Sequence, residues 1–271
     1  MKRTCLIYLI YRRLRVGLGA LGFILIYGTY MHSFPIMLLF VGFGFAFIDI
    51  FSGTYNDYQD YELDLRNKRK DKWIIAGLVT RKQMLYISLV FLFFGLDFLY
   101  LTNFSVLFLG IVYSILMWGY SYPSIPLKRN ISTYMLLASI YLILPYLLTT
   151  LFNRSFTVFD FFFGLFCFSQ SMYLYSQKDS TDLKDHTNIF LQKGWRIASL
   201  LCILFGIFTS MSLFVLSFLT ASSLFVWGIN SFLKFYLMKS IYKGNITKKY
   251  RDRIVLFEFL TPYLYVLGGL L

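Results

Sequence analysis

Long apolar runs, separated by short charged segments, dominate this chain of 271 residues. A membrane-spanning helix needs about 20 predominantly apolar residues, and about nine segments come close to that criterion. They are residues 16–32, 35–55, 84–102, 104–120, 131–151, 157–177, 196–210, 213–236 and 254–271. Backbone polar groups inside a bilayer must be hydrogen-bonded within the chain, so such runs form helices. We therefore predict an all-α integral membrane protein, with residues 1–271 as one polytopic domain.

The composition excludes two other classes of protein. Hydrophobic residues make up 58% of the chain and charged residues 14%, whereas soluble domains are about 25% charged. Disordered chains combine low hydrophobicity with many charges, which this chain does not. The net charge of +13 could indicate a nucleic-acid partner. The charges are too sparse and the apolar runs too long for that interpretation, so we expect a lipid bilayer as partner and no nucleic acid.

The basic residues predict the orientation in the membrane. Apart from Arg154, every Lys and Arg belongs to the N-terminus or to residues 56–82, 121–130, 178–193 and 239–253, when helix ends are counted with the nearer side. The opposite connections, near residues 32–33, 102–103 and 210–212, contain no Lys or Arg. Because basic loops stay in the cytoplasm, the N-terminus and the charged breaks are predicted to be cytoplasmic. An odd number of spans then places the C-terminus outside.

Seven of the 13 acidic residues form two clusters on the cytoplasmic side, and the first occupies residues 56–64. If the second span continues as a helix, Asn56, Asp60 and Asp64 share one face at four-residue spacing, with Asp57 beside them. Like charges this close need a compensating cation, and Mg²⁺ prefers such oxygen ligands. The alternative is a solvated acidic helix end, neutralised by the basic residues that follow.

The second acidic cluster contains Asp179, Asp182 and Asp185, spaced three residues apart, and His186. It follows the sixth span as the first cluster follows the second span, so both clusters lie at the same membrane surface. Two acidic sites facing each other across a bundle could form a two-metal clamp for a diphosphate. The alternative is a solvated loop of alternating charge.

These motifs resemble those of the UbiA superfamily of intramembrane prenyltransferases. The family's first motif, N-D-x-x-D-x-x-x-D, is matched in full by Asn56, Asp57, Asp60 and Asp64. The basic residues after the motif are also similar, although Trp73 stands where the family often has proline.

The second motif of the family often reads K-D-x-x-D-x-x-x-D. Lys178, Asp179 and Asp182 match its first part, whereas the last acid, Asp185, comes one position early. The segment from Tyr122 to Arg129 resembles the family's basic loop after the fourth span. With the pattern of spans, the resemblance covers essentially the whole chain.

The resemblance implies a helical bundle with a central cavity that opens near the cytoplasmic face. The donor would be an isoprenyl diphosphate, and two Mg²⁺ ions would bridge the carboxylates and the phosphate oxygens. The implied metal ligands are Asn56, Asp57, Asp60, Asp64, Asp179, Asp182 and Asp185, of which Asp60, Asp64 and Asp179 are also the implied catalytic residues. The implied diphosphate-binding cations are Arg69, Lys72, Lys128, Arg129 and Lys178. As an alternative, each cation could anchor anionic lipid.

Ionisation of the donor would leave an allylic carbocation, which aromatic faces or a nearby anion stabilise. Tyr113, Tyr120 and Tyr175 lie toward the cytoplasmic halves of their spans and could supply such faces. Asp49 lies within the second span, about two turns before Asn56, where it could orient the acceptor or take its proton. Alternatively, these aromatic rings face lipid or neighbouring helices, and Asp49 is a hydrogen-bonded packing residue.

The leading hypothesis for function is Mg²⁺-dependent prenyl transfer from an isoprenyl diphosphate to a lipophilic acceptor. An aromatic quinone precursor is the first choice of acceptor, by frequency in the family, and lipid, sugar-phosphate and carotenoid acceptors stay open. A rival class is a cation transporter, whose carboxylates should lie near the bilayer midplane on broken helices. A non-catalytic relative is a third alternative, because the second motif is irregular.

Overall fold

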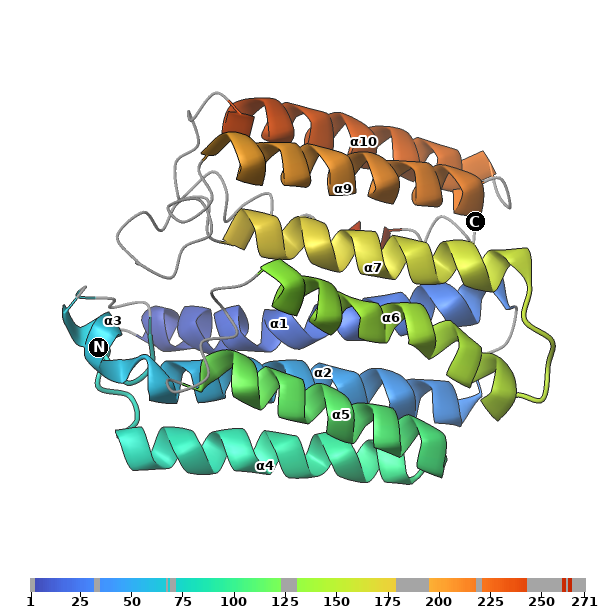
Figure 1. Cartoon of the computed structure of the whole chain (residues 1–271). Helices are drawn as coiled ribbons and strands as arrows, with labels where there is room; N and C mark the ends of the chain where they lie inside the picture. Colours follow the sequence, from blue (N-terminus) through green and yellow to red (C-terminus); the bar gives the residue numbers. More distant parts are fainter. Residues whose placement is uncertain are drawn as a thin grey trace. The chain divides into compact units, whose positions relative to one another are not determined.

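The structure is a computed structural model that describes residues 3–31, 35–66, 68, 72–122, 131–178, 195–217, 221–242, 260–261 and 263–264. Every regular element within these residues is a helix, which confirms the all-α prediction. The helices are α1 (Arg3–Tyr30), α2 (Ile36–Gln59), α3 (Tyr61–Arg66), α4 (Arg81–Tyr100), α5 (Phe104–Ser121), α6 (Ile131–Leu151), α7 (Val158–Lys178), α9 (Trp195–Ser217) and α10 (Ala221–Tyr242) (Figure 1).

Five predicted spans coincide with a helix to within a few residues, whereas α1 begins 13 residues before the predicted start at residue 16. One predicted break is wrong. The sequence placed a connection at residues 210–212, whereas α9 runs without interruption to Ser217. The hydroxyl groups of Thr209 and Ser212 donate to the carbonyl oxygens of Phe205 and Phe208, one turn earlier in the same helix. Because these polar side chains bond to their own backbone, they do not end the helix.

The chain forms two compact units, and the first comprises residues 1–25 and 34–127. In this unit α2 packs against α4 and α5, which also pack against each other. The contact between α2 and α4 depends on small residues. A Cβ atom on Gly95 would lie 2.9 Å from Ile48 Cγ1 and 3.0 Å from the carbonyl oxygen of Gly44. Small residues of this kind let helix backbones approach closely inside a membrane.

The second unit comprises residues 26–33 and 128–271. Its α7 packs against both α6 and α9, and α9 also packs against α10. Gly206 of α9 lies at a crowded point, because a Cβ atom there would lie 2.5 Å from Met238 Sδ and 3.6 Å from Tyr173 Cδ2. As in the first unit, a glycine permits the close approach of helices.

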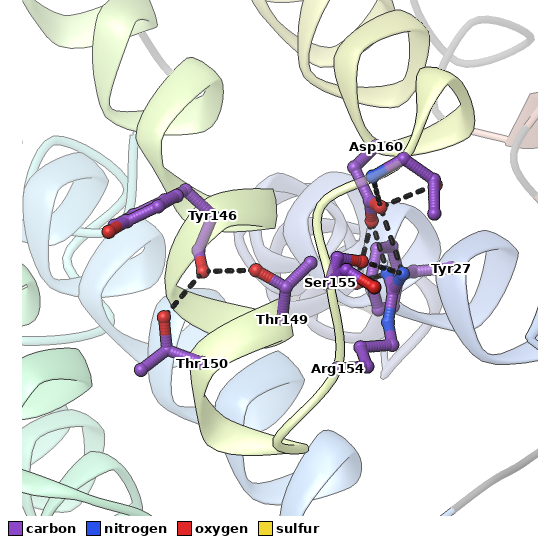
Figure 2. A network of polar contacts seen from close by, with 8 residues as sticks. Tyr27, Tyr146, Thr149, Thr150, Arg154, Ser155 and Asp160 are labelled. Atoms are coloured by element: carbon purple, nitrogen blue, oxygen red, sulfur yellow. Dashed lines mark hydrogen bonds and ion pairs between the residues drawn. The ribbon is translucent and has the colours of Figure 1, made fainter.

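A buried ionic network ties the end of α1 to the start of α7 in the second unit (Figure 2). Asp160 is fully buried and accepts hydrogen bonds from the Arg154 guanidinium, the Tyr27 hydroxyl and the Thr157 hydroxyl. Burial alone would lower the pKa of Arg154, but hydrogen bonds to Asp160 and Tyr27 raise this pKa above its ordinary value. The guanidinium therefore stays charged at neutral and moderately alkaline pH.

Three of the described helices, α2, α4 and α5, are long and apolar enough to cross a bilayer. Four further apolar helical stretches are shorter, namely Gly17–Thr29, Met135–Leu151, Val158–Leu174 and Leu200–Leu216. Most of the predicted last span, 254–271, lies outside the described residues. The count of about nine spans, the central cavity, the sidedness of the termini and the single domain over residues 1–271 stay predictions.

The network around Asp160 leads to a prediction about stability. In Asp160→Asn the side chain keeps its shape but loses the charge that compensates Arg154, and breaking one side of a buried ion pair costs about 3 kcal/mol. We expect a clearly lower unfolding temperature in thermal melts in one detergent. Ser155→Ala is the matched control, since Ser155 contributes only its carbonyl oxygen to Arg154. An unchanged melting temperature for Asp160→Asn would contradict a structural role for the network.

Candidate active site

The first acidic motif lies at the cytoplasmic end predicted for α2, where the helix passes almost directly into α3 (Figure 1). The backbone N–H of Asp60 donates to the carbonyl oxygen of Asn56 at 2.9 Å, and that of Asp64 donates to the carbonyl oxygen of Asp60 at 2.8 Å. These bonds preserve helical spacing through the turn at Asp60. The backbone thus keeps the four-residue spacing that the sequence predicted for Asn56, Asp60 and Asp64.

Two carboxylates of the motif converge on one cationic group. Asp57 and Asp64 are 1% and 6% exposed, and the Lys72 ammonium lies 2.5 Å from Asp57 Oδ1 and 3.5 Å from Asp64 Oδ2. Lys72 comes from the described part of the segment between α3 and α4, and its side chain lies against the motif. The structure places Lys72 at the motif, where the sequence predicted a ligand for the diphosphate.

Asn56 links the motif to a neighbouring helix. Its amide nitrogen donates to Asp60 Oδ2 at 2.8 Å, and its amide oxygen accepts from the Ser121 hydroxyl, at the end of α5, at 3.3 Å. Hydrogen bonds at both the nitrogen and the oxygen of the amide thus fix the orientation of the Asn56 side chain. The position of Ser121 also brings the end of α5, and the adjacent buried Tyr120, to the level of the motif.

The first residue of α4 also lies at the motif, although the sequence reasoning did not single it out. The guanidinium carbon of Arg81 lies 4.9 Å from the ring centre of Tyr58 and 5.6 Å from that of Tyr61. The start of α4 is held by a capping box, in which Thr80 and Gln83 exchange hydrogen bonds. Arg81 comes 17 residues after Asp64 in the sequence, so no local pattern indicates such a contact.

Deeper in the same unit, the structure joins two residues that the sequence proposed separately. The Tyr113 hydroxyl of α5 donates to Asp49 Oδ1 of α2 at 2.7 Å. Both residues are buried, with exposed fractions of 8% for Asp49 and 1% for Tyr113.

Several predicted site residues lie outside the part of the chain that the structure describes. These are Arg69, Lys128, Arg129, Asp179, Asp182 and Asp185, together with the side chains of Tyr175 and Lys178. Among the described residues, no three Asp, Glu, His or Cys side chains are arranged to hold a metal ion by themselves. The first motif, which is described in full, supplies two carboxylates that converge on Lys72.

This donor set fits Mg²⁺. The ammonium of Lys72 shows that Asp57 and Asp64 point their oxygen atoms at one positively charged group. Asn56 and Asp60, which belong to the same motif, are hydrogen-bonded to each other. Mg²⁺ is commonly held by one or two carboxylates, with waters and substrate phosphates as its other ligands. The first motif can therefore provide the protein's share of one such ion.

The structure also corrects the assignment of a basic residue in the second unit. Lys234 was counted with the charged cytoplasmic break, as a helix-end residue, but it lies within α10 and is fully buried. Its ammonium lies 4.9 Å from the ring centre of Tyr173 in α7. The aromatic face compensates part of the cost of burying this cation.

The described features define a helical membrane protein with an acidic motif suited to a divalent cation. Comparison with known proteins gives its family: the chain belongs to the UbiA prenyltransferase family, whose model matches residues 16–257. The match covers both acidic motifs and confirms the resemblance noted in the sequence.

Solved structures support the same fold. A UbiA homologue from Archaeoglobus fulgidus bound to GPP and Mg²⁺ has a TM-score of 0.65 and 15% identity, over 95% of this chain and 98% of that chain. The same homologue bound to DMAPP and Mg²⁺ gives 0.65 and 15%, over 95% and 97%. A digeranylgeranylglyceryl phosphate synthase gives 0.57 and 18%, over 98% and 96%. No curated protein matches the sequence significantly.

The contacts of Lys72 lead to a test of metal binding that does not depend on turnover. Lys72→Met removes the cation beside two buried carboxylates, so we expect a lower melting temperature than that of the wild type. Mg²⁺ should then raise the melting temperature of Lys72→Met more than that of the wild type, since it replaces the missing charge. The matched control, Lys82→Met, changes an exposed lysine of α4 and should behave like the wild type. Equal Mg²⁺ responses in all three proteins would contradict the cation site.

Proposed function

We propose that the protein transfers an isoprenyl group from an isoprenyl diphosphate to a lipophilic acceptor within the membrane. The observation that carries the proposal is the convergence of two buried motif carboxylates, Asp57 and Asp64, on the ammonium of Lys72. Family membership supports the reaction class. The homologues bound to GPP or DMAPP together with Mg²⁺ support the class of donor and the metal.

The acidic residues would hold the metal and, through it, the diphosphate. Asn56, Asp57, Asp60 and Asp64 belong to the first motif. Asp179, Asp182 and Asp185 of the second motif would supply the opposing ligands, so that two ions are bound. Mg²⁺, when bound, neutralises the diphosphate and makes it a better leaving group.

Basic side chains would take up the remaining negative charge of the diphosphate. Lys72 already lies at the first motif, where an ammonium can bind phosphate oxygen atoms as a point charge. The other proposed cations are Arg69, Lys128, Arg129 and Lys178. Asp60, Asp64 and Asp179 are proposed as the acids most directly involved in catalysis, because they place the leaving group for departure.

The bond between C1 of the prenyl group and the diphosphate oxygen would break, and its electron pair would leave with the diphosphate. The resulting allylic cation is stabilised by aromatic faces. Tyr113 and Tyr120 are the proposed faces in α5, with Tyr175 in α7. C1 then bonds to the nucleophilic atom of the acceptor, which loses one proton.

The acceptor is proposed to be aromatic, of the quinone-precursor type, and the reaction to occur near the cytoplasmic surface. The excess of basic residues in the connections that carry both motifs supports this placement, with the N-terminus inside and the C-terminus outside. A lipid, a sugar phosphate or a carotenoid end are the alternative acceptors.

Diphosphate release is the direct test of this function. The purified protein in lipid, with Mg²⁺ and allylic diphosphates of several chain lengths, should release diphosphate faster when an acceptor is present. Asp60→Ala and Asp179→Ala should each lower the rate by a factor of about 10³ or more, because loss of the charges that stabilise the leaving group is costly in an apolar site.

Glu62→Ala is the matched control for these variants. Glu62 is an exposed acid between Asp60 and Asp64 that does not belong to the motif, so its removal should leave the rate near that of the wild type. Wild-type turnover in both Asp60→Ala and Asp179→Ala would contradict the metal clamp. Loss of activity in Glu62→Ala alone would contradict the assignment of ligands within the first cluster.

A further inference from the structure

Asp49 is a carboxylate buried in the interior of a membrane-length helix. It lies seven residues before Asn56 in α2, which is about 10 Å along the helix axis and nearly the same face. Its exposed fraction is 8%. Ionisable residues inside membrane spans are costly and rare, and they generally mark functional sites. Because Asp49 lies inside the span and not at its end, we consider its role separately from that of the motif.

A row of polar contacts connects Asp49 with the motif along the contact between α2 and α5. Asp49 accepts from Tyr113 at 2.7 Å, the Ser52 hydroxyl lies 3.2 Å from Met117 Sδ, and Asn56 accepts from Ser121 at 3.3 Å. The α2 members are three and four residues apart, and the α5 members are four apart. The two helices thus run parallel, and these three contacts form one row of polar groups from the motif to Asp49.

The geometry defines what Asp49 can bind. Tyr113 is 1% exposed, and its ring packs against Phe45 with ring centres 5.9 Å apart, so its hydroxyl holds one carboxylate oxygen in place. A carboxylate accepts several hydrogen bonds and can therefore accept one from a ligand hydroxyl in addition to that of Tyr113. In its ionised form, Asp49 would repel an anionic group, and the repulsion is strong in surroundings of low dielectric constant.

We propose that Asp49 binds a neutral hydroxyl group of the acceptor and takes its proton, and that Tyr113 positions the Asp49 carboxylate. This inference rests on the proposed function and specifies its acceptor: an alcohol or phenol without a negative charge near the reacting hydroxyl. In this proton transfer Asp49 is the catalytic residue and the Tyr113 hydroxyl acts through it, whereas the Tyr113 ring keeps its proposed role as an aromatic face.

The step balances without a further reactant. The C1–O bond of the donor breaks and its electron pair leaves with the diphosphate. The acceptor oxygen bonds to C1, its O–H bond breaks, and the proton passes to the Asp49 carboxylate. For a phenol that reacts at a ring carbon, the same proton transfer gives a neutral dienone, which becomes aromatic again when the ring proton moves to the oxygen.

The experiment compares Asp49→Asn and Tyr113→Phe with the wild type on paired acceptors. One pair is a naphthohydroquinone with and without a ring carboxylate, and the other is a monoalkylglycerol with and without a phosphate. The wild type should prefer the neutral member of the pair it uses. Asp49→Asn should lower kcat by a factor of about 10²–10⁴, the usual contribution of a general base. It should also reduce the ratio of the rates with the neutral and the anionic acceptor. Tyr113→Phe should lower kcat by about tenfold.

Donor binding provides the check on folding. Asp49→Asn and Tyr113→Phe should bind an allylic diphosphate with Mg²⁺ as tightly as the wild type, and Asp49→Glu should recover part of the lost kcat. Ser114→Ala is the control, because Ser114 bonds only to the backbone of its own helix at Gly110; it should match the wild type.

Some outcomes would contradict the role of Asp49 alone, and another would contradict the proposed function as well. If the wild type releases diphosphate and Asp49→Asn has the same kcat and the same acceptor preference, only the role of Asp49 is wrong. A wild-type preference for the anionic acceptor has the same consequence. If the wild type releases no diphosphate with any donor or acceptor, the proposed function is wrong and the role of Asp49 with it.

Discussion

A carboxylate that is removed from water inside a membrane protein has to be tied to a donor, and this constraint explains much of the described structure. The four buried acids of the described residues are Asp49, Asp57, Asp64 and Asp160. Each contacts a residue of another segment: Tyr113 for Asp49, Lys72 for Asp57 and Asp64, and Arg154 for Asp160. The few buried carboxylates thus specify which segments contact each other. Burial of apolar surface stabilises the packing but does not specify individual contacts, because it is not directional.

The three sets of contacts serve different purposes. Around Asp160 the carboxylate is bound by a cation, a phenol and a threonine, which leaves a structural tie between α1 and α7. At Asp57 and Asp64 the two carboxylates both contact the ammonium of Lys72. At Asp49 the carboxylate accepts a hydrogen bond from a neutral phenol, that of Tyr113. We infer from this gradation that the first set stabilises the fold and the other two serve the reaction.

The helices of this protein could be predicted from hydropathy, because long apolar runs leave few alternatives to a spanning helix. The break predicted at residues 210–212 was wrong, because the Ser212 hydroxyl bonds to the backbone of its own helix and does not interrupt that helix. The first motif could also be predicted, since its residues share one helix face at local spacing. The contacts of Arg81 with Tyr58, and of Asp49 with Tyr113, could not, because tertiary packing brings together side chains that are far apart in the sequence.

We propose that the first acidic motif holds a divalent cation together with a diphosphate. The most direct test is a structure of the protein with Mn²⁺ and an allylic thiodiphosphate that reacts slowly, in which anomalous scattering locates the metal. We expect Mn²⁺ within coordination distance of carboxylate oxygen atoms of the first motif and of the diphosphate, with Lys72 contacting the diphosphate. Mn²⁺ bound to the diphosphate alone, with Asp57 and Asp64 still paired to Lys72, would contradict the claim.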